Sequence, residues 1–200
     1  MVVFDATLLL LLLRPNAGRP VDSSGNPIPA IQERLNHLVQ RLEARKTRII
    51  IPTPALSEVL VHAGAAGPDI LATLTRSTVF KVEPFDTKAA VEAALMTKAA
   101  IDSGNKRSGL AATWAKVKFD RQIVAIAKVF AVSAIYSDDP DVRALAAAEN
   151  IPVISLAELP LPSPKSQMEI QLAPPTEQPD LLNQEDEPSD VAEQSGDEPA

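Results

Sequence analysis

The fold is decided by one stretch, Val117–Val142, with the sequence VKFDRQIVAIAKVFAVSAIYSDDPDV. Asp120 opens an apolar helical run, and this run leads into a short apolar segment, Ala134–Tyr136, that is typical of a buried strand. Three acids follow that strand: Asp138, Asp139 and Asp141. Open α/β sheets place their sites at the carboxyl ends of strands. The stretch therefore predicts both a sheet and a candidate site at its edge.

Two further acids have similar settings. Asp5 follows the apolar segment Val2–Phe4, and Glu58 lies within the apolar run Pro54–Leu60. Any one such acid is more often a helix cap or a solvated charge than a functional group. Their joint pattern is the main functional signal in the sequence.

Strand-like and helix-like segments alternate along the chain, which predicts an α/β fold with a parallel five-stranded sheet flanked by helices. The expected strands are 1–4, 48–52, 78–82, 134–136 and 152–154. The expected helices are 7–13, 31–42, one that begins after an N-cap at Thr53, 68–76, 86–101, 119–132 and 142–149. Between them, Arg14–Pro29 is a long loop and Ser103–Gly109 is a flexible basic loop.

Charge divides the chain into two parts. Residues from Leu161 onward contain ten acids, one base and seven prolines, whereas Met1–Pro160 has 18 bases and 16 acids. We therefore expect a folded domain at 1–160 and a disordered acidic tail at 161–200. The absence of cysteine fits a reducing cytoplasm. The run Leu8–Leu13 is too short to span a bilayer and predicts a buried helix, so no membrane association is expected.

Several carboxylates at one sheet edge are in electrostatic conflict, because like charges raise each other's pKa. A divalent cation removes this conflict. Mg²⁺ and Mn²⁺ prefer oxygen ligands, so a cluster of Asp and Glu side chains suits them. A metal held in this way can activate water and hold a phosphodiester for in-line attack. If the acids converge, the sequence favours the chemistry of a metal-dependent nuclease.

The order of these motifs resembles the PIN domain family, as in VapC-type toxins. The motifs are Asp5-x-Thr7, Ser57-Glu58, Asp120 at the opening of a helix and Ser137-x-Asp139, and the resemblance covers Val2–Leu159. It implies a PIN-like fold and a metal-dependent endoribonuclease with Mg²⁺ or Mn²⁺ as cofactor. It also implies RNA as substrate, a small antitoxin protein as partner and a homodimer.

The same resemblance implies roles for individual residues. The catalytic metal ligands would be Asp5, Glu58, Asp120 and Asp139, with Thr7, Ser137 and Asp141 in support. Asp138 stands at a variable position of the motif and remains an alternative to Asp139.

Basic residues before and after the start of the central helix are candidates for contacts with an RNA backbone. They are Lys106, Arg107, Lys116, Lys118 and Arg121, and a solvated basic face is the alternative explanation. Trp114 could stack on a base or anchor the loop. An alternative for the whole domain is a non-catalytic PIN-like module that binds RNA or protein. A third possibility is a different phosphate-ester enzyme built on a similar sheet.

Overall fold

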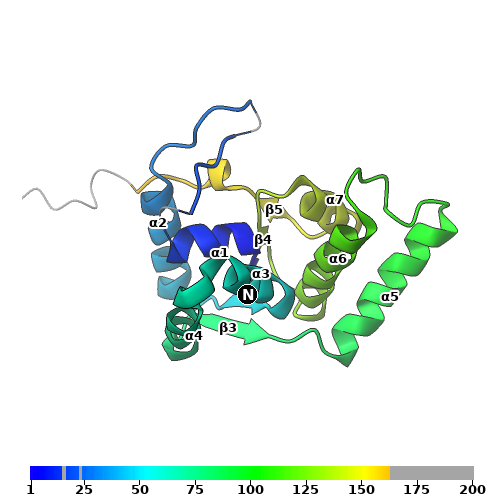
Figure 1. The fold of residues 1–200 in the computed structure, drawn as a ribbon, viewed down its shortest axis with the longest axis horizontal. Coiled ribbons are helices and arrows are strands. Elements are labelled where there is room, and N and C mark those ends of the chain that lie inside the picture. Colours follow the sequence, from blue (N-terminus) through cyan, green and yellow to red (C-terminus); the bar gives the residue numbers. More distant parts are fainter. Residues whose placement is uncertain (15–16, 23, 163–200) are drawn as a thin grey trace, which may run out of the picture. The chain divides into compact units, whose positions relative to one another are not determined.

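The computed structural model describes residues 1–14, 17–22 and 24–162. Within them five parallel strands form one sheet in the order β3-β2-β1-β4-β5, which confirms the predicted α/β fold (Figure 1). The strands are β1 (Val2–Phe4), β2 (Ile49–Pro52), β3 (Phe80–Glu83), β4 (Ile135–Tyr136) and β5 (Val153–Ile154). The predicted acidic tail lies outside the described residues from Ser163 onward, so its state and the division at residue 160 stay predictions.

Helices connect the strands and flank the sheet (Figure 1). They are α1 (Ala6–Leu13), α2 (Ile31–Ala44), α3 (Thr53–Ala63), α4 (Gly67–Arg76), α5 (Thr87–Asp102), α6 (Trp114–Val129) and α7 (Pro140–Ala148). Short 3-10 turns span Gly64–Ala66 and Leu156–Glu158. Helix α1 packs against α2 and α3, whereas α6 packs against α5 and α7. Among the described residues, no helix combines the length and apolar character needed to cross a membrane.

The core lies around the central strands. All three residues of β1 and all four of β2 are buried, and the ring of Phe4 makes edge contacts with Tyr136 and Phe80 at centroid distances of 5.4 and 6.5 Å. The leucine run forms α1, whose Leu8 and Leu9 are fully buried. Continuous apolar runs are typical of strands covered on both faces, and they give this sheet its buried centre.

The order in which the chain adds strands to the sheet switches sides between β1 and β4. From β1 it proceeds to β2 and β3 on one side, and then crosses to β4 and β5 on the other side. Phe4 is paired with Tyr136, so the residues that follow these two strands emerge side by side. Such a switch point is where open α/β sheets form a crevice for ligands.

Three predicted helix starts need correction. Helix α6 begins at Trp114 rather than at Phe119, because the Thr113 side chain caps it by accepting the N–H of Lys116. Asp120 therefore lies in the second turn and does not open the helix. Helix α3 has Pro52 as its N-cap, and the hydroxyl of Thr53 instead accepts the N–H of Phe85. Helix α7 begins at Pro140, two residues before the predicted start.

Candidate functional site

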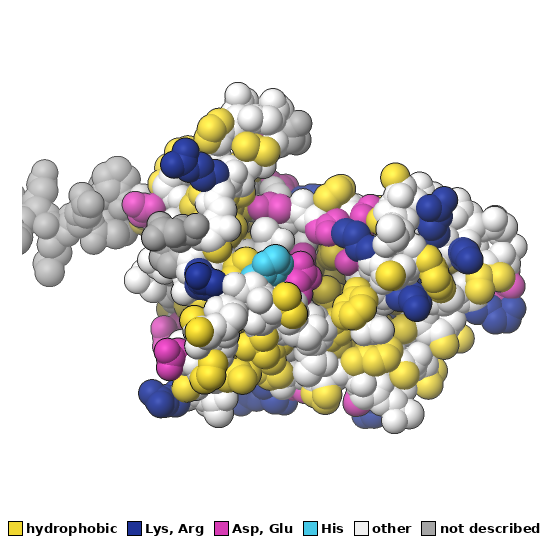
Figure 2. All heavy atoms as spheres, viewed as in Figure 1, with side chains coloured by type: hydrophobic (Ala, Val, Ile, Leu, Met, Phe, Trp, Pro, Cys, Tyr) yellow, Lys and Arg dark blue, Asp and Glu magenta, His cyan; other side chains and the backbone are white. Residues whose placement is uncertain are grey.

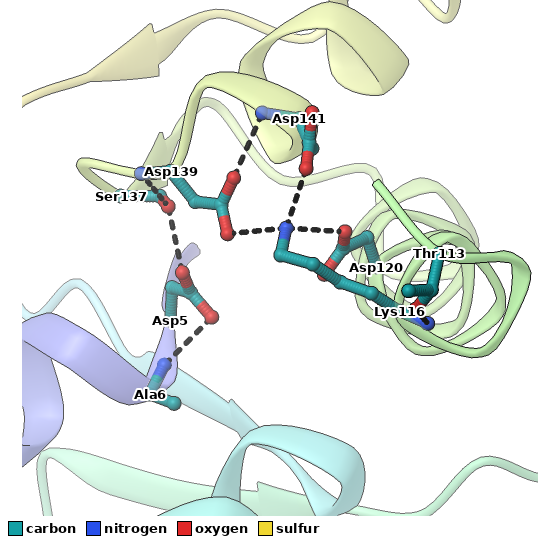
Figure 3. Close-up of polar contacts among 8 residues, drawn as sticks. All are labelled: Asp5, Ala6, Thr113, Lys116, Asp120, Ser137, Asp139 and Asp141. Atoms are coloured by element: carbon teal, nitrogen blue, oxygen red, sulfur yellow. Dashed lines mark hydrogen bonds and ion pairs between the residues drawn. The ribbon is translucent and has the colours of Figure 1, made fainter. Parts of the chain in front are cut away.

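The candidate site lies at the carboxyl ends of β1 and β4, at the switch point of the sheet. Asp5 follows β1, Ser137 and Asp139 follow β4, and Asp120 reaches the same place from α6 (Figure 3). On the face drawn in Figure 2, acidic side chains gather near the middle, with a basic side chain among them. The predicted convergence of acids from distant segments is therefore present for these residues.

Asp5 is buried and held in place by two hydrogen bonds. Its Oδ1 accepts the N–H of Ala6 at 2.7 Å, which caps α1, and its Oδ2 accepts the hydroxyl of Ser137 at 2.7 Å. Burial raises the pKa of Asp5, and the two hydrogen bonds oppose this rise. The side chain is 6% exposed, so its carboxylate lies at the floor of the site.

Ser137 connects Asp5 to the loop that follows β4. Its hydroxyl donates to Asp5 and accepts the backbone N–H of Asp139 at 3.0 Å. The side chain is completely buried, so water does not compete for either bond. Ser137 therefore fixes the position of Asp139 relative to Asp5.

The two carboxylate oxygens of Asp139 make different contacts. It is the N-cap of α7, and its Oδ1 accepts the N–H of Asp141 at 2.8 Å. Its Oδ2 points away from the helix toward α6, as does one oxygen of Asp141 (Figure 3). Capping and cation binding are therefore compatible at Asp139, because they use different oxygens.

Asp120 faces the same point from the second turn of α6. Its side chain is 9% exposed, and burial raises its pKa to about 6, against the opposing hydrogen bond from Lys116. A carboxylate in this setting is stabilised in its charged form when a cation lies beside it.

The cation beside these acids is the ammonium of Lys116. Its Nζ lies 2.7 Å from an oxygen of Asp139, 2.7 Å from one of Asp141 and 2.9 Å from one of Asp120 (Figure 3). Desolvation lowers the pKa of Lys116, but the hydrogen bonds to the three carboxylates outweigh it and raise the pKa above its ordinary value.

The donor set suits a divalent cation of the Mg²⁺ type. Asp120, Asp139 and Asp141 each offer one carboxylate oxygen, and these oxygens all lie within 4.8 Å of one another. Oxygen ligands of this kind are what Mg²⁺ and Mn²⁺ prefer. The ammonium of Lys116 is a stand-in cation at the same position, which shows that the cluster attracts positive charge.

Glu58 and Thr7 lie apart from this cluster. Glu58 is exposed on α3, and its charge makes a contribution to the raised pKa of Asp5 that ranks behind burial and Asp139. Both Glu58 and Thr7 line a largely apolar cavity of about 300 Å³ between α1 and α3, as does His62. Of the four expected ligands, the structure thus brings Asp120 and Asp139 together, places Asp5 against them through Ser137, and leaves Glu58 at the rim.

Asp138 faces away from the cluster. Its Oδ1 accepts the N–H of Leu156 at 2.7 Å, and its Oδ2 is buried without a hydrogen-bond partner among the described residues. It lines a separate cavity with Arg143 and Glu158. Burial raises the pKa of Asp138. The geometry favours Asp139 over Asp138 as a metal ligand.

The five basic residues expected at an RNA surface occupy three different settings. Lys106, Arg107 and Lys118 are exposed, and the first and last have their ammonium groups 5.5 and 5.9 Å from the centre of the Trp114 ring. Lys116 is held by the acids. Arg121 is 2% exposed, which differs from the expected surface position.

Arg121 serves as an anchor for the loop before α6. Its guanidinium donates to the carbonyl of Lys106 at 2.7 Å and to the hydroxyl of Ser108 at 2.8 Å, and it lies 5.4 Å from the centre of the Trp114 ring. Trp114 is half-buried under these cations. Trp114 therefore helps to anchor the loop, as considered from the sequence, and part of the residue stays exposed.

The sequence did not indicate that the ammonium of Lys116 lies among the acids of the site. Its spacing of four residues before Asp120 was the available signal, because residues i and i+4 are neighbours on a helix. Its contacts with Asp139 and Asp141 depend on the packing of α6 against α7, which no local pattern reveals.

Comparison with known proteins shows a likeness of fold. No protein-family model matches the chain, and no curated protein matches its sequence. Among solved structures, a chain from VapBC2 of Rickettsia felis, bound to a DNA fragment from its promoter, matches with a TM-score of 0.50 and 9% identity. The match covers 78% of this chain and 98% of that one. At this identity the match shows a likeness of fold and nothing further.

Proposed function

We propose that the chain is a Mg²⁺- or Mn²⁺-dependent endoribonuclease of the PIN type, with its nuclease domain at residues 1–160. The observation that carries the proposal is the convergence of Asp120, Asp139 and Asp141 at the switch point of the sheet, beside buried Asp5. Three segments far apart in the sequence supply these acids. If each acid served only as a helix cap or a solvated charge, their side chains would not need to converge at one place.

Within this proposal the residues have distinct roles. Asp120, Asp139 and Asp141 would hold the metal, and Ser137 would orient both Asp5 and Asp139 through its two hydrogen bonds. Asp5 would add its charge at the floor of the site. When bound, the metal would supply Lewis-acid activation of water and would neutralise charge on the phosphodiester. Glu58 on α3 and Thr7 on α1 would act from the cavity that they both line.

The exposed basic residues near the site would bind the RNA backbone. Lys106 and Arg107 lie on the loop before α6, and Lys118 lies in the second turn of α6, the helix that carries Asp120. Phosphate contacts from such side chains position a nucleic acid without reading its sequence. The partly exposed ring of Trp114 is available to stack on an unpaired base.

The proposal includes a protein partner and a cellular setting. The solved structure of similar fold is that of VapBC2, and a small antitoxin that covers the acidic site is the partner we propose here. We further propose a homodimer, on the basis of the family resemblance, and a cytoplasmic location, on the basis of the cysteine-free sequence.

An alternative function is that of a non-catalytic PIN-like binding module. One observation favours it: the ammonium of Lys116 already balances charge in the cluster, so the acids can stand together without a metal. In this case RNA or a protein partner would bind the surface without being cleaved.

The test is cleavage of a structured RNA pool by purified protein with Mn²⁺ and with EDTA. We expect cleavage with Mn²⁺ only, and its loss in Asp5→Asn and in Asp120→Asn. Asp69→Asn is a matched control, because Asp69 is an exposed acid on α4 outside the site. Circular dichroism checks that each variant is folded. Cleavage that both site variants retain would overturn the nuclease proposal, and RNA binding without cleavage would support the binding module.

A further inference from the structure

Lys116 occupies the position that a metal ion would need at the acidic cluster. An ammonium group has three N–H donors. The three carboxylate oxygens within 2.7–2.9 Å of Nζ belong to Asp139, Asp141 and Asp120. These three are also the acids whose oxygens converge as a candidate cation site. The ammonium therefore uses all of its donors on the ligands that a metal would use.

The helix itself does not explain why a cation lies there. Lys116 is in the first turn of α6, where the helix dipole disfavours positive charge. Its backbone N–H is satisfied by the Thr113 side chain at 3.3 Å, so the backbone would remain capped if the side chain moved. The carboxylates alone hold the ammonium in place.

Lys116 is also able to leave. Its side chain is 42% exposed, although its charged end is among the acids. A lysine has a flexible four-carbon stem, so the ammonium can turn out to solvent without a change in α6. An ammonium and a divalent cation repel each other, so they cannot both occupy the point where the three carboxylate oxygens converge.

We propose that Lys116 is a built-in competitor for the metal, and that metal binding requires its ammonium to withdraw from the cluster. This inference rests on the proposed metal-dependent function and adds a control element to it. The apparent metal affinity of such a protein is its intrinsic affinity reduced by the fraction of molecules with the ammonium withdrawn. The side chain at this position thereby sets the metal concentration at which the site fills.

The first experiment is calorimetric titration of the metal-free full chain with Mn²⁺, without RNA. Lys116→Met keeps the length and apolar stem of the side chain but removes the charge. The matched control is Lys128→Met, because Lys128 lies on the same helix, about 18 Å further along. Its ammonium also bridges two carboxylates, those of Glu92 and Glu149 at 2.9 and 2.7 Å.

We expect Lys116→Met to bind Mn²⁺ about tenfold more tightly than wild type, or better, as for a site blocked in nine molecules of ten. Lys128→Met should bind like wild type. Equal or weaker binding by Lys116→Met would overturn the inference, as would a lack of Mn²⁺ binding by both wild type and Lys116→Met.

A second measurement uses only the wild-type protein and is independent of whether the variant folds. Lysines are acetylated briefly with and without saturating Mn²⁺, and the modified positions are quantified by mass spectrometry. We expect labelling of Lys116 to rise several-fold with Mn²⁺, while that of Lys128 stays constant. Unchanged labelling of Lys116 would overturn the inference. If both experiments succeed but no RNA is cut, the competitor role stands and the nuclease proposal fails.

Discussion

The hydroxyl of Ser137 donates a 2.7 Å hydrogen bond to Oδ2 of Asp5, across 132 positions of the sequence. Both residues follow the ends of neighbouring strands, and both are buried. The same hydroxyl accepts the N–H of Asp139. One small side chain thus joins two strands and fixes the relative positions of two candidate catalytic acids.

Ser137→Ala is expected to destabilise the domain by about 1–3 kcal/mol, because it leaves a buried carboxylate oxygen without its donor. The free energy of unfolding is measured by urea denaturation. Ser103→Ala is the control, since the exposed Ser103 hydroxyl donates only to the carbonyl of Ala100, and its effect should stay within about 0.5 kcal/mol. Equal stabilities of the two variants would show that the buried bond contributes nothing.

Arg121→Met is expected to cost about 2 kcal/mol and to loosen the loop before α6, because hydrogen bonds from a charged donor to the carbonyl of Lys106 and to Ser108 are lost. Urea denaturation reports the stability, and hydrogen exchange of residues 103–110 reports the loop. Arg107→Met, which removes an exposed arginine of the same loop, is the control. If Arg121→Met instead keeps full stability and weakens RNA binding, Arg121 is the RNA contact first expected from the sequence.

Much of the fold follows from local patterns. The apolar segments around Val3, Ile50 and Ile135 alternate with helical runs, and this alternation is enough to predict five parallel strands. Asp5 and Asp139 could be placed at the sheet edge because each follows a strand. The predicted start of α6 at Phe119 was wrong for a physical reason. The first turn of α6 carries Lys116 instead of an acid, so the sequence lacks the usual charge signal of a helix start.

The remaining features depend on tertiary packing. Asp120 and Lys116 are neighbours by spacing, but their meeting with Asp139 and Asp141 requires α6 to lie against α7. Burial of Arg121 depends on a loop that folds back over its guanidinium. Nor does the sequence show that Asp138 turns away from the cluster. The Oδ1 of Asp138 accepts the distant N–H of Leu156, whereas that of Asp139 accepts the nearby N–H of Asp141.

Glu158 provides a pH-dependent test of the packing around the short 3-10 turn Leu156–Glu158. Its carboxylate accepts the backbone N–H and the hydroxyl of Ser155 and pairs with Arg143 at 3.0 Å, which lowers its pKa to about 2. A carboxyl with a lowered folded-state pKa adds stability above its unfolded pKa, near 4.5, and loses it as the pH falls toward 2.

Glu158→Gln is therefore expected to lower the free energy of unfolding at pH 7 and to have a smaller effect at pH 3. Because the side chain is 55% exposed, the loss at pH 7 should be about 1 kcal/mol. Urea denaturation of wild type and variant at both pH values measures the difference. An effect that is equal at pH 3 and pH 7 would contradict the role of the ionised carboxylate.

Cleavage of RNA by wild type, Asp139→Asn and Asp138→Asn, compared side by side with Mn²⁺, tests most directly whether the acidic cluster is an active centre. The two variants change adjacent acids in the same way, but only Asp139 faces the cluster. We predict Mn²⁺-dependent cleavage by wild type and Asp138→Asn, and a rate at least ~10-fold lower for Asp139→Asn, because a metal ligand is lost. Cleavage by Asp139→Asn at the wild-type rate would contradict the assignment of this cluster as the catalytic metal site.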